Sequence, residues 1–228
     1  MFEFLFIDLD DTILDFKMQE RVAIRKTLSE AGIDPTDEVC ALYSRINEDH
    51  WKRLEKGELT RQQVLLGRFQ TLFEQLGITG DAAQTKAAYE QNLSEGHYFL
   101  PGAEEALQAL SSKYKLYLAS NGTTHVQEKR LASANIGRYF QNIFISQKVG
   151  VNKPDKAFFE YCFAQIPGFD PAKTMIVGDS LSSDILGGKN AGIATCWVNP
   201  KHKQADPDII PDYEIESLSQ LESLLATL

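Results

Sequence analysis

The stretch FLFIDLDDT at residues 4–12 decides the fold, because a short, wholly apolar run leads directly into a turn of acidic residues. The run FLFI is typical of a strand that is buried on both faces of a parallel sheet. Ligands of open α/β sheets bind at the carboxyl ends of the strands. The acidic turn therefore predicts a functional site at the end of this first strand.

After this turn, the amino-acid composition of the sequence changes. From about residue 17 to residue 98 the chain is rich in Glu, Gln, Leu, Ala and Arg at helical spacing, and it contains no convincing strand. Gly32 and Gly77 stand where two of these helices are expected to end. This stretch is predicted to be an all-helical insert.

After Pro101 the pattern becomes a regular alternation of helices and strands. The expected strands are 115–120, 142–146, 174–178 and 194–198, and the expected helices are 103–113, 125–136, 156–166, 181–192 and 217–228. Repeated βα units of this length predict an α/β fold with a doubly wound parallel sheet. The predicted organisation is a core domain of residues 1–16 and 99–228 that carries a helical cap domain at 17–98. The segment 202–213 is expected to be a surface loop.

The composition and net charge of the chain limit the kinds of molecule that it is expected to bind. The 228 residues, 43% of them hydrophobic, suffice for a core domain with an insert. With 32 acidic and 23 basic residues the net charge is −9, which disfavours nucleic-acid polymers and anionic membranes. The three cysteines are far apart and lack metal-ligand spacing, and the apolar start has no basic region before it. We expect a cytoplasmic protein, with a monomer and a homodimer equally open.

Polar residues stand at the expected carboxyl end of each strand. Asp8, Asp10 and Thr12 follow the first, Ser120 and Asn121 the second, Lys153 the third, and Asp179 and Asp184 the fourth. Each group alone is explained equally well by ordinary turns and helix caps. Together they would converge on one edge of the sheet.

Four carboxylates in one confined place, at positions 8, 10, 179 and 184, would repel one another unless a cation were bound. Carboxylate oxygens suit a hard cation, and Mg²⁺ suits a site that also holds a phosphate oxygen and water. The charge of Lys153 and backbone N–H groups at a helix start would help to hold a phosphate dianion. The residues thus predict a magnesium-dependent phosphate site.

In order along the chain, the motifs DLDDT (8–12), LAS (118–120), NKPD (152–155) and GDSLSSD (178–184) resemble those of the haloacid dehalogenase-like (HAD) superfamily. The resemblance implies a Rossmann-like core and a phosphatase that works through an aspartyl-phosphate intermediate. Asp8 would be the nucleophile, Asp10 the general acid and then base, and Thr12 a positioning group. The dehalogenases of the superfamily lack an acid two residues after the nucleophile, so Asp10 favours phosphoryl chemistry.

The same resemblance implies roles at the other strand ends. Ser120 and Asn121 would bind the phosphoryl group, and Lys153 would stabilise its charge. Asp179 would bind magnesium beside Asp8 and the backbone carbonyl of Asp10, with Asp184 orienting the metal's surroundings.

The stretches NEDHWKRLEKGELTRQQVLLGRFQTLFEQLGI (47–78) and GDSLSSDILGGKNAGIATCWVN (178–199) resemble the bacterial branch of pyrimidine-nucleotide 5'-nucleotidases, which also act on noncanonical nucleotides, and the resemblance extends over most of the chain. This implies a nucleoside monophosphate as substrate. Phe16 and Trp51, and less specifically Tyr89 and Phe99, are candidates for contacting its base, although each is also explained by helix packing. Arg68 is explained equally well by an ion pair inside the cap and by a substrate contact.

The same motifs are compatible with other functions. Within the superfamily, a sugar-phosphate phosphatase and a phosphomutase share the motifs. A phospho-accepting receiver-like switch also combines an aspartate, neighbouring acids and a lysine, but it is shorter and has no counterpart of Asp10. A catalytically silent interaction module would not need the complete set of motif residues.

Overall fold

The computed structural model describes residues 1–228, and the chain forms two compact units. The first, called the core unit here, contains residues 1–15 and 97–228, and the second, the helical unit, contains residues 16–96. No helix combines the length and apolar character that a membrane span requires.

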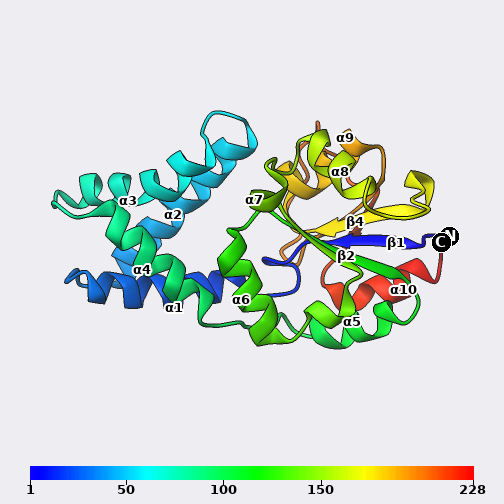
Figure 1. Cartoon of the computed structure of the whole chain (residues 1–228), viewed down its shortest axis with the longest axis horizontal. Coiled ribbons are helices and arrows are strands. Elements are labelled where there is room, and N and C mark those ends of the chain that lie inside the picture. The colour runs from blue at the N-terminus through cyan, green and yellow to red at the C-terminus, as the bar shows by residue number, and fades with distance from the viewer. The chain divides into compact units, whose positions relative to one another are not determined.

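A six-stranded sheet, parallel throughout, forms the centre of the core unit, with the strands in the order β3-β2-β1-β4-β5-β6 (Figure 1). The strands are β1 (Phe4–Ile7), β2 (Lys115–Ser120), β3 (Asn142–Ile145), β4 (Thr174–Gly178), β5 (Ala194–Val198) and β6 (Tyr213–Ile215). The register pairs Ile7 of β1 with Leu118 on one side and Val177 on the other. The carboxyl ends of these three central strands therefore lie at one edge.

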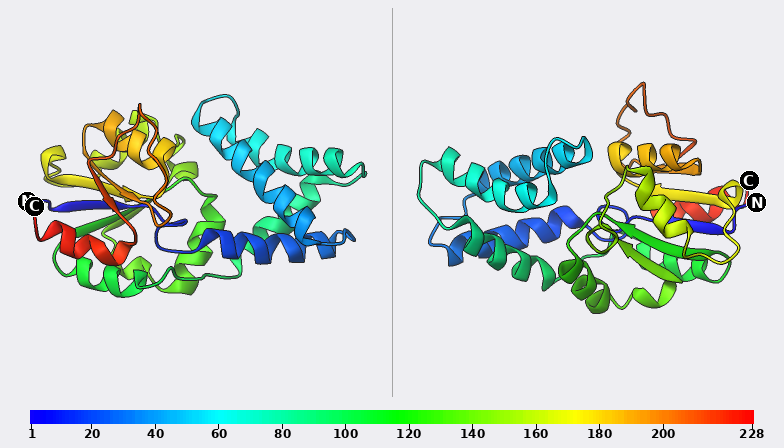
Figure 2. Two further views of the ribbon diagram at one scale, coloured as in Figure 1. Left: turned by 180° about the vertical axis from the view of Figure 1, so that it is seen from behind. Right: turned by 45° about the horizontal axis from the view of Figure 1, so that its top comes forward.

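Helices cover both faces of the sheet, as Figures 1 and 2 show from three directions. One face carries α5 (Ala103–Ser111), α6 (Thr124–Ala134) and α10 (Leu221–Leu225), and the other carries α8 (Lys156–Phe163) and α9 (Leu186–Ala191). This arrangement confirms the predicted doubly wound α/β fold.

The alternation of side chains along β1 explains why its run is apolar throughout. Leu5 and Ile7 pack into the cluster that contains the helices α5, α6 and α10, whereas Phe4 and Phe6 pack into the cluster that contains α8. All four side chains are buried. Stacked and edge-to-face rings make the second layer largely aromatic, for example Phe6 against Tyr117 at 5.3 Å.

The structure corrects several predicted boundaries. The segment 181–192 is not one helix: a π-helical turn, η3 (Leu181–Ile185), precedes α9. The predicted closing helix at 217–228 divides into a 3₁₀ turn, η4 (Leu218–Gln220), and the short α10. Tyr213, assigned to a loop, begins the edge strand β6, whose three residues are too few to show a periodic pattern.

Smaller elements connect the larger ones. They are the short helix α7 (Ser146–Val149) and the 3₁₀ turns η1 (Gly137–Tyr139) and η2 (Pro171–Lys173). The helix α8 ends at Phe163, three residues before the predicted end at 166. Short turns of this kind lack the length that makes a helical pattern readable in the sequence.

The helical unit consists of α1 (Phe16–Glu30), α2 (Asp37–Glu55), α3 (Arg61–Leu76) and α4 (Ala82–Ser94). Local signals set the ends of α3: Thr60 and Gln63 form a capping box at its start, and Gly77 ends it in the left-handed conformation at φ 65°. Gly32, just beyond α1, is also left-handed, as expected for a residue that ends a helix.

Aromatic packing forms the interior of the helical unit. Tyr43, Phe69 and Tyr89 are buried, with ring centroids 5.3–5.6 Å apart. The guanidinium of the buried Arg68 lies 4.8 Å from the centroid of Tyr89 and donates to Asn47 Oδ1 at 2.9 Å. The packing interpretation therefore holds for Tyr89, and Arg68 belongs to the polar interior of this unit.

Candidate active site

A tight turn after β1 presents the first acidic residues. The Asp8 N–H donates to the carbonyl of Val177 (2.9 Å), which continues the β1–β4 pairing by one residue. The N–H groups of Ile13 and Leu14 then donate to the Leu9 carbonyl at 3.0 and 2.9 Å. Asp11 adopts φ 57°, a left-handed conformation that aspartate tolerates. The chain thus turns back at once and leaves Asp8 and Asp10 at the carboxyl edge of the sheet.

Lys153 joins two of the predicted carboxylates. Its Nζ donates to Asp8 Oδ1 and to Asp184 Oδ1, both at 2.6 Å, and to the carbonyl of Ala119 at 2.5 Å. The side chains of Lys153 and Asp184 are each 1% exposed, and that of Asp8 is 10% exposed. Three strand ends, those of β1, β2 and β4, are therefore connected through one buried ammonium group.

The electrostatics of this group follow from burial and from an imbalance of charge. Burial raises the pKa of Asp8 to about 8, Asp184 and Asp10 add to the rise, and Lys153 opposes it. Burial by itself would lower the pKa of Lys153, but the charges of Asp184 and Asp8 raise it above its ordinary value. A single lysine thus leaves the carboxylates with excess negative charge.

A bound cation would balance this excess negative charge. Asp8, Asp179 and Asp184 each offer one carboxylate oxygen, and these oxygens lie within 4.8 Å of one another. Oxygen-only donors of this charge suit Mg²⁺. The backbone N–H of Ser180 donates to Asp184 Oδ2 at 3.1 Å, and Trp197 Nε1 donates to the main-chain carbonyl of Asp179 at 2.8 Å. The residues present therefore fit a magnesium centre.

Gly178 makes room for this arrangement. A Cβ atom at this position would lie 2.2 Å from Asp184 Oδ2 and 2.3 Å from its Cγ. Ser180 caps the start of the π-helical turn, its hydroxyl accepting from the Ser183 N–H, and the Asp184 side chain folds back over Gly178. The glycine of the GDSLSSD motif is thus needed for the position of its second aspartate.

The residues after β2 have structural contacts of their own. Ser120, which is 1% exposed, accepts at Oγ from Gln127 Nε2 (2.9 Å) and from the Gly122 N–H (3.1 Å). Asn121 holds the Lys153 backbone at both ends, accepting from its N–H at 2.9 Å and donating to its carbonyl at 2.9 Å. The side chain of Asn121 therefore positions the lysine, and a phosphoryl contact by either residue stays a prediction.

Thr12 has an unusual environment for a polar residue. It is 1% exposed, and its hydroxyl has no hydrogen-bond partner in the chain. A buried hydroxyl that loses its partners is costly. A group supplied from outside the chain would relieve this cost, and the positioning role of Thr12 stays a prediction.

The sequence did not reveal two residues that contact Asp10. Arg130 Nη1 donates to Asp10 Oδ1 at 2.5 Å, and Gln127 Nε2 donates to Asp10 Oδ2 at 2.6 Å. Both come from α6, which starts after the Ser120-Asn121-Gly122 turn. The available signal was their spacing of three residues, which places two polar side chains on the same helix face as Val126 and Leu131.

The candidate aromatic residues lie in different parts of the chain. Phe99 is partly buried in the core unit and makes an edge-to-face contact with His97 at 5.7 Å. Phe16 begins α1, and Trp51 lies on α2, where the Arg61 guanidinium is 5.6 Å from its ring centroid. Substrate contacts by Phe16 and Trp51 stay predictions.

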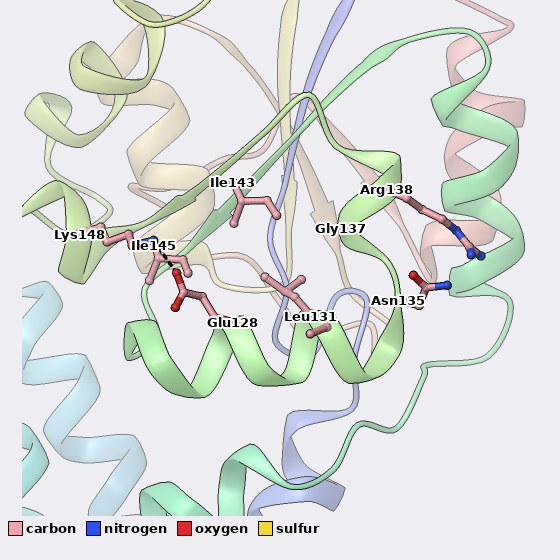
Figure 3. A pocket seen from close by; sticks show the side chains of 9 residues that line it. Glu128, Leu131, Asn135, Gly137, Arg138, Ile143, Ile145 and Lys148 are labelled. Atoms are coloured by element: carbon pink, nitrogen blue, oxygen red, sulfur yellow. Dashed lines mark hydrogen bonds and ion pairs between the residues drawn. The ribbon is translucent and has the colours of Figure 1, made fainter.

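A pocket of about 410 Å³ lies between α6 and β3 in the core unit (Figure 3). Its lining residues include Glu128, Leu131, Ile143 and Lys148, and none of them belongs to the acidic cluster. Glu128 and Lys148 form an ion pair across it at 2.5 Å. The carboxylate cluster, with its buried charges, is the candidate active site, and this pocket is separate from it.

The chain is similar in sequence and structure to known hydrolases. The model of the haloacid dehalogenase-like hydrolase family matches residues 3–192. The HAD-hydrolase YfnB of Bacillus subtilis is 40% identical over 221 residues, which cover 97% of this chain and 94% of YfnB. A crystal structure of YfnB, described as bound to magnesium and as revealing interdomain movement, has a TM-score of 0.94 and covers 98% of each chain.

Two other relatives have named activities. The pyrimidine 5'-nucleotidase PynA of Streptococcus pneumoniae is 38% identical over 221 residues, with 96% of this chain and 93% of PynA covered. The pyrimidine 5'-nucleotidase YjjG of Escherichia coli is 32% identical over 223 residues, with 98% of this chain and 97% of YjjG covered. Both matches therefore include the helical unit as well as the core unit.

Proposed function

The chain belongs to the haloacid dehalogenase-like hydrolase family, and from this premise we propose that it is a magnesium-dependent phosphatase of nucleoside 5'-monophosphates, with pyrimidine nucleotides as the preferred substrates. One observation carries the proposal. The buried Asp8 is held by Lys153 beside two further carboxylates, at the sheet edge where ligands of this fold bind.

The first chemical step follows from this arrangement. Asp8 attacks phosphorus, the bond from phosphorus to the ester oxygen breaks, and Asp10 gives a proton to the departing oxygen. Lys153 holds Asp8 in place and offsets the negative charge that the phosphoryl group brings into the site. The products of this step are the free nucleoside and a phosphoryl group bound covalently to Asp8.

The second step returns the enzyme to its starting state. Asp10, now ionised, takes a proton from a water molecule as that water attacks phosphorus, and the bond between Asp8 and phosphorus breaks. Inorganic phosphate leaves. Magnesium held by Asp8, Asp179, Asp184 and the carbonyl of Asp10 would neutralise charge on the phosphoryl oxygens.

Asp10 separates this proposal from dehalogenase chemistry. A phosphate ester needs an acid for its departing oxygen, and Asp10 stands two residues after Asp8 with both carboxylate oxygens held by α6. The nucleotide preference is supported by the two relatives named pyrimidine 5'-nucleotidases, each matched along almost its whole length. The helical unit would select the departing group, with Phe16 and Trp51 as candidates.

Phosphate release from a substrate panel tests the proposal. With Mg²⁺ present, the purified protein is expected to release phosphate from uridine, thymidine and cytidine monophosphates with higher kcat/KM than from purine nucleotides or sugar phosphates. If sugar phosphates rank equal or higher, the nucleotide assignment fails while the phosphatase assignment stands. A requirement for a sugar bisphosphate as activator would instead indicate a phosphomutase.

A further inference from the structure

Two side chains of α6 enclose the carboxylate of Asp10. Arg130 contacts one oxygen at 2.5 Å and Gln127 the other at 2.6 Å. Arg130 Nη1 also donates to Gln127 Oε1 at 2.8 Å, so the three side chains form a closed set of hydrogen bonds. No other hydrogen bond or ion pair of the Asp10 side chain is present, and its position therefore depends on these two residues.

The burial of Arg130 indicates that this contact has a function. Its side chain is 0% exposed, whereas that of Asp10 is 26% exposed. A buried guanidinium is costly unless it is paired, and apolar side chains would pack more favourably against the sheet. The neighbouring inward positions Val126, Leu131 and Ala134 are indeed apolar. Packing alone does not call for an arginine here.

Gln127 connects Asp10 to the loop after β2. Its Nε2 donates to Asp10 Oδ2 and also to Ser120 Oγ at 2.9 Å. A Cβ at Gly122 would lie 2.3 Å from Nε2 and 2.5 Å from Cδ of this side chain. The absence of a Cβ at Gly122 thus leaves the space in which the Gln127 side chain lies when it contacts Asp10.

We propose that Gln127 and Arg130 are positioning residues that hold the proton-transfer group Asp10 in its working orientation, and that Gly122 provides the space this requires. The inference rests on the proposed function. Each carboxylate oxygen has two lone pairs, and the α6 contacts use one on each oxygen. The second lone pair on each oxygen remains available to interact with the ester oxygen or with water, and the two α6 contacts fix the plane of the Asp10 carboxyl group.

This proposal predicts a dependence on the departing group. An alkoxide such as that of a nucleoside needs a correctly placed proton, whereas p-nitrophenolate departs readily without one. A displacement of about 1 Å costs on the order of a hundredfold in rate. Misplacing Asp10 should therefore harm hydrolysis of nucleotides more than hydrolysis of p-nitrophenyl phosphate.

The test compares kcat/KM for uridine 5'-monophosphate and p-nitrophenyl phosphate, with Mg²⁺ present. In Gln127→Leu and Arg130→Met the value for the nucleotide is expected to fall about tenfold to a hundredfold, and the value for p-nitrophenyl phosphate clearly less. Arg130→Lys, which keeps a charged donor, is expected to recover part of the loss. Glu128→Gln serves as the matched control, because Glu128 is an exposed α6 residue that pairs with Lys148 and does not contact Asp10, and it is expected to leave both values unchanged.

A double-mutant comparison separates the possible outcomes. In an Asp10→Asn background the α6 substitutions are expected to add almost no further loss, because they act through Asp10. If the α6 substitutions lower kcat/KM equally for both substrates, or lower it as much in the Asp10→Asn background as in the wild type, Gln127 and Arg130 have only a structural role. If Arg130→Met does not fold, Gln127→Leu and Gly122→Ala decide the question by the same criteria. Full nucleotide hydrolysis by Asp10→Asn itself would instead overturn the proposed function.

Discussion

The carboxyl group of Asp8 is buried, which favours its neutral form, although the proposed reaction needs its ionised form. In the proposed mechanism Asp8 must be ionised to attack phosphorus, yet burial raises its pKa to about 8, with Asp184 and Asp10 adding to the rise. Lys153, in direct contact with Asp8, opposes this effect, and a bound divalent cation would oppose it further. The same burial that makes the ionised form costly also keeps bulk water from weakening its interactions. The site therefore depends on its cations.

Gly178 offers a test of how closely Asp184 must be positioned. In Gly178→Ala the new methyl group would collide with the Asp184 carboxylate, so we expect weaker magnesium binding and lower activity. The Mg²⁺ concentration for half-maximal activity should rise about tenfold. Gly137→Ala is the control, because its Cβ would meet only Ile143 Cδ1 at 3.8 Å. Unchanged magnesium dependence in Gly178→Ala would contradict this account of the glycine.

Some site residues were predictable from the sequence and others were not. Asp8, Lys153 and Asp184 could be placed together because each follows a readable strand, and parallel strands bring their carboxyl ends to one edge. Gln127 and Arg130 could not, because polar residues on a helix ordinarily face solvent. Their burial depends on how closely the turn after β1 approaches α6, which no local pattern reveals.

At the scale of elements, the long periodic segments were predicted well and the short ones poorly. The helices α1 to α4 are long enough to show a helical pattern, and β1 is recognised as a wholly apolar run, whereas β6 has three residues and α7 only one helical turn of four. The π-helical turn at 181–185 was also missed. In this turn the N–H groups of both Asp184 and Ile185 donate to the Ser180 carbonyl, and the Asp184 side chain accepts from the Ser180 N–H.

The loop before β6 is attached to the sheet by Asp212. Its Oδ2 accepts from the N–H and the hydroxyl of Thr195, at 2.9 and 2.7 Å, and its Oδ1 accepts from Lys189 at 2.6 Å. Burial would raise the pKa of Asp212, but the hydrogen bonds from Lys189 and Thr195 outweigh it and hold that pKa below the ordinary value of 3.8. The ionised form is therefore favoured in the folded state.

We expect Asp212→Asn to lower the free energy of unfolding at neutral pH by about 1 kcal/mol, because the side chain is partly exposed. A lowered folded-state pKa gives stability that is present above the unfolded pKa and lost as the pH falls through the folded pKa. The difference from the wild type should thus shrink between about pH 5 and pH 3. Urea denaturation at several pH values measures it, with the exposed Asp208→Asn as control. A difference independent of pH would contradict this account.

At the scale of the whole molecule, the helical unit is inserted directly after the first two residues of the candidate site, Asp8 and Asp10. The helical unit begins at residue 16, immediately beyond the turn that presents Asp8 and Asp10. It has its own buried interior, built from Tyr43, Phe69 and Tyr89. If the helical unit selects the substrate, as proposed, its sequence can vary without changing the short motifs of the core unit, so those motifs predict the reaction class and not the substrate.

Magnesium should affect the folded protein as well as its activity. Excess EDTA is expected to abolish phosphate release, and added Mg²⁺ to restore it. A ligand that binds only the folded state raises the unfolding temperature as its concentration rises. This rise should be present in the wild type and in Asp208→Asn but largely lost in Asp184→Asn. Full activity in EDTA, with no change in unfolding temperature on adding Mg²⁺, would exclude the metal centre.

The central claim is that Asp8 takes up the phosphoryl group, and trapping that group tests it most directly. The wild type and Asp10→Asn would be quenched in acid during turnover of p-nitrophenyl phosphate with Mg²⁺ and mapped by peptide mass spectrometry. We predict phosphate on Asp8, in greater amount in Asp10→Asn because water attack is slowed, and no turnover in Asp8→Asn. Phosphate release that persists in Asp8→Asn, with no modified Asp8 in the other two proteins, would contradict the account.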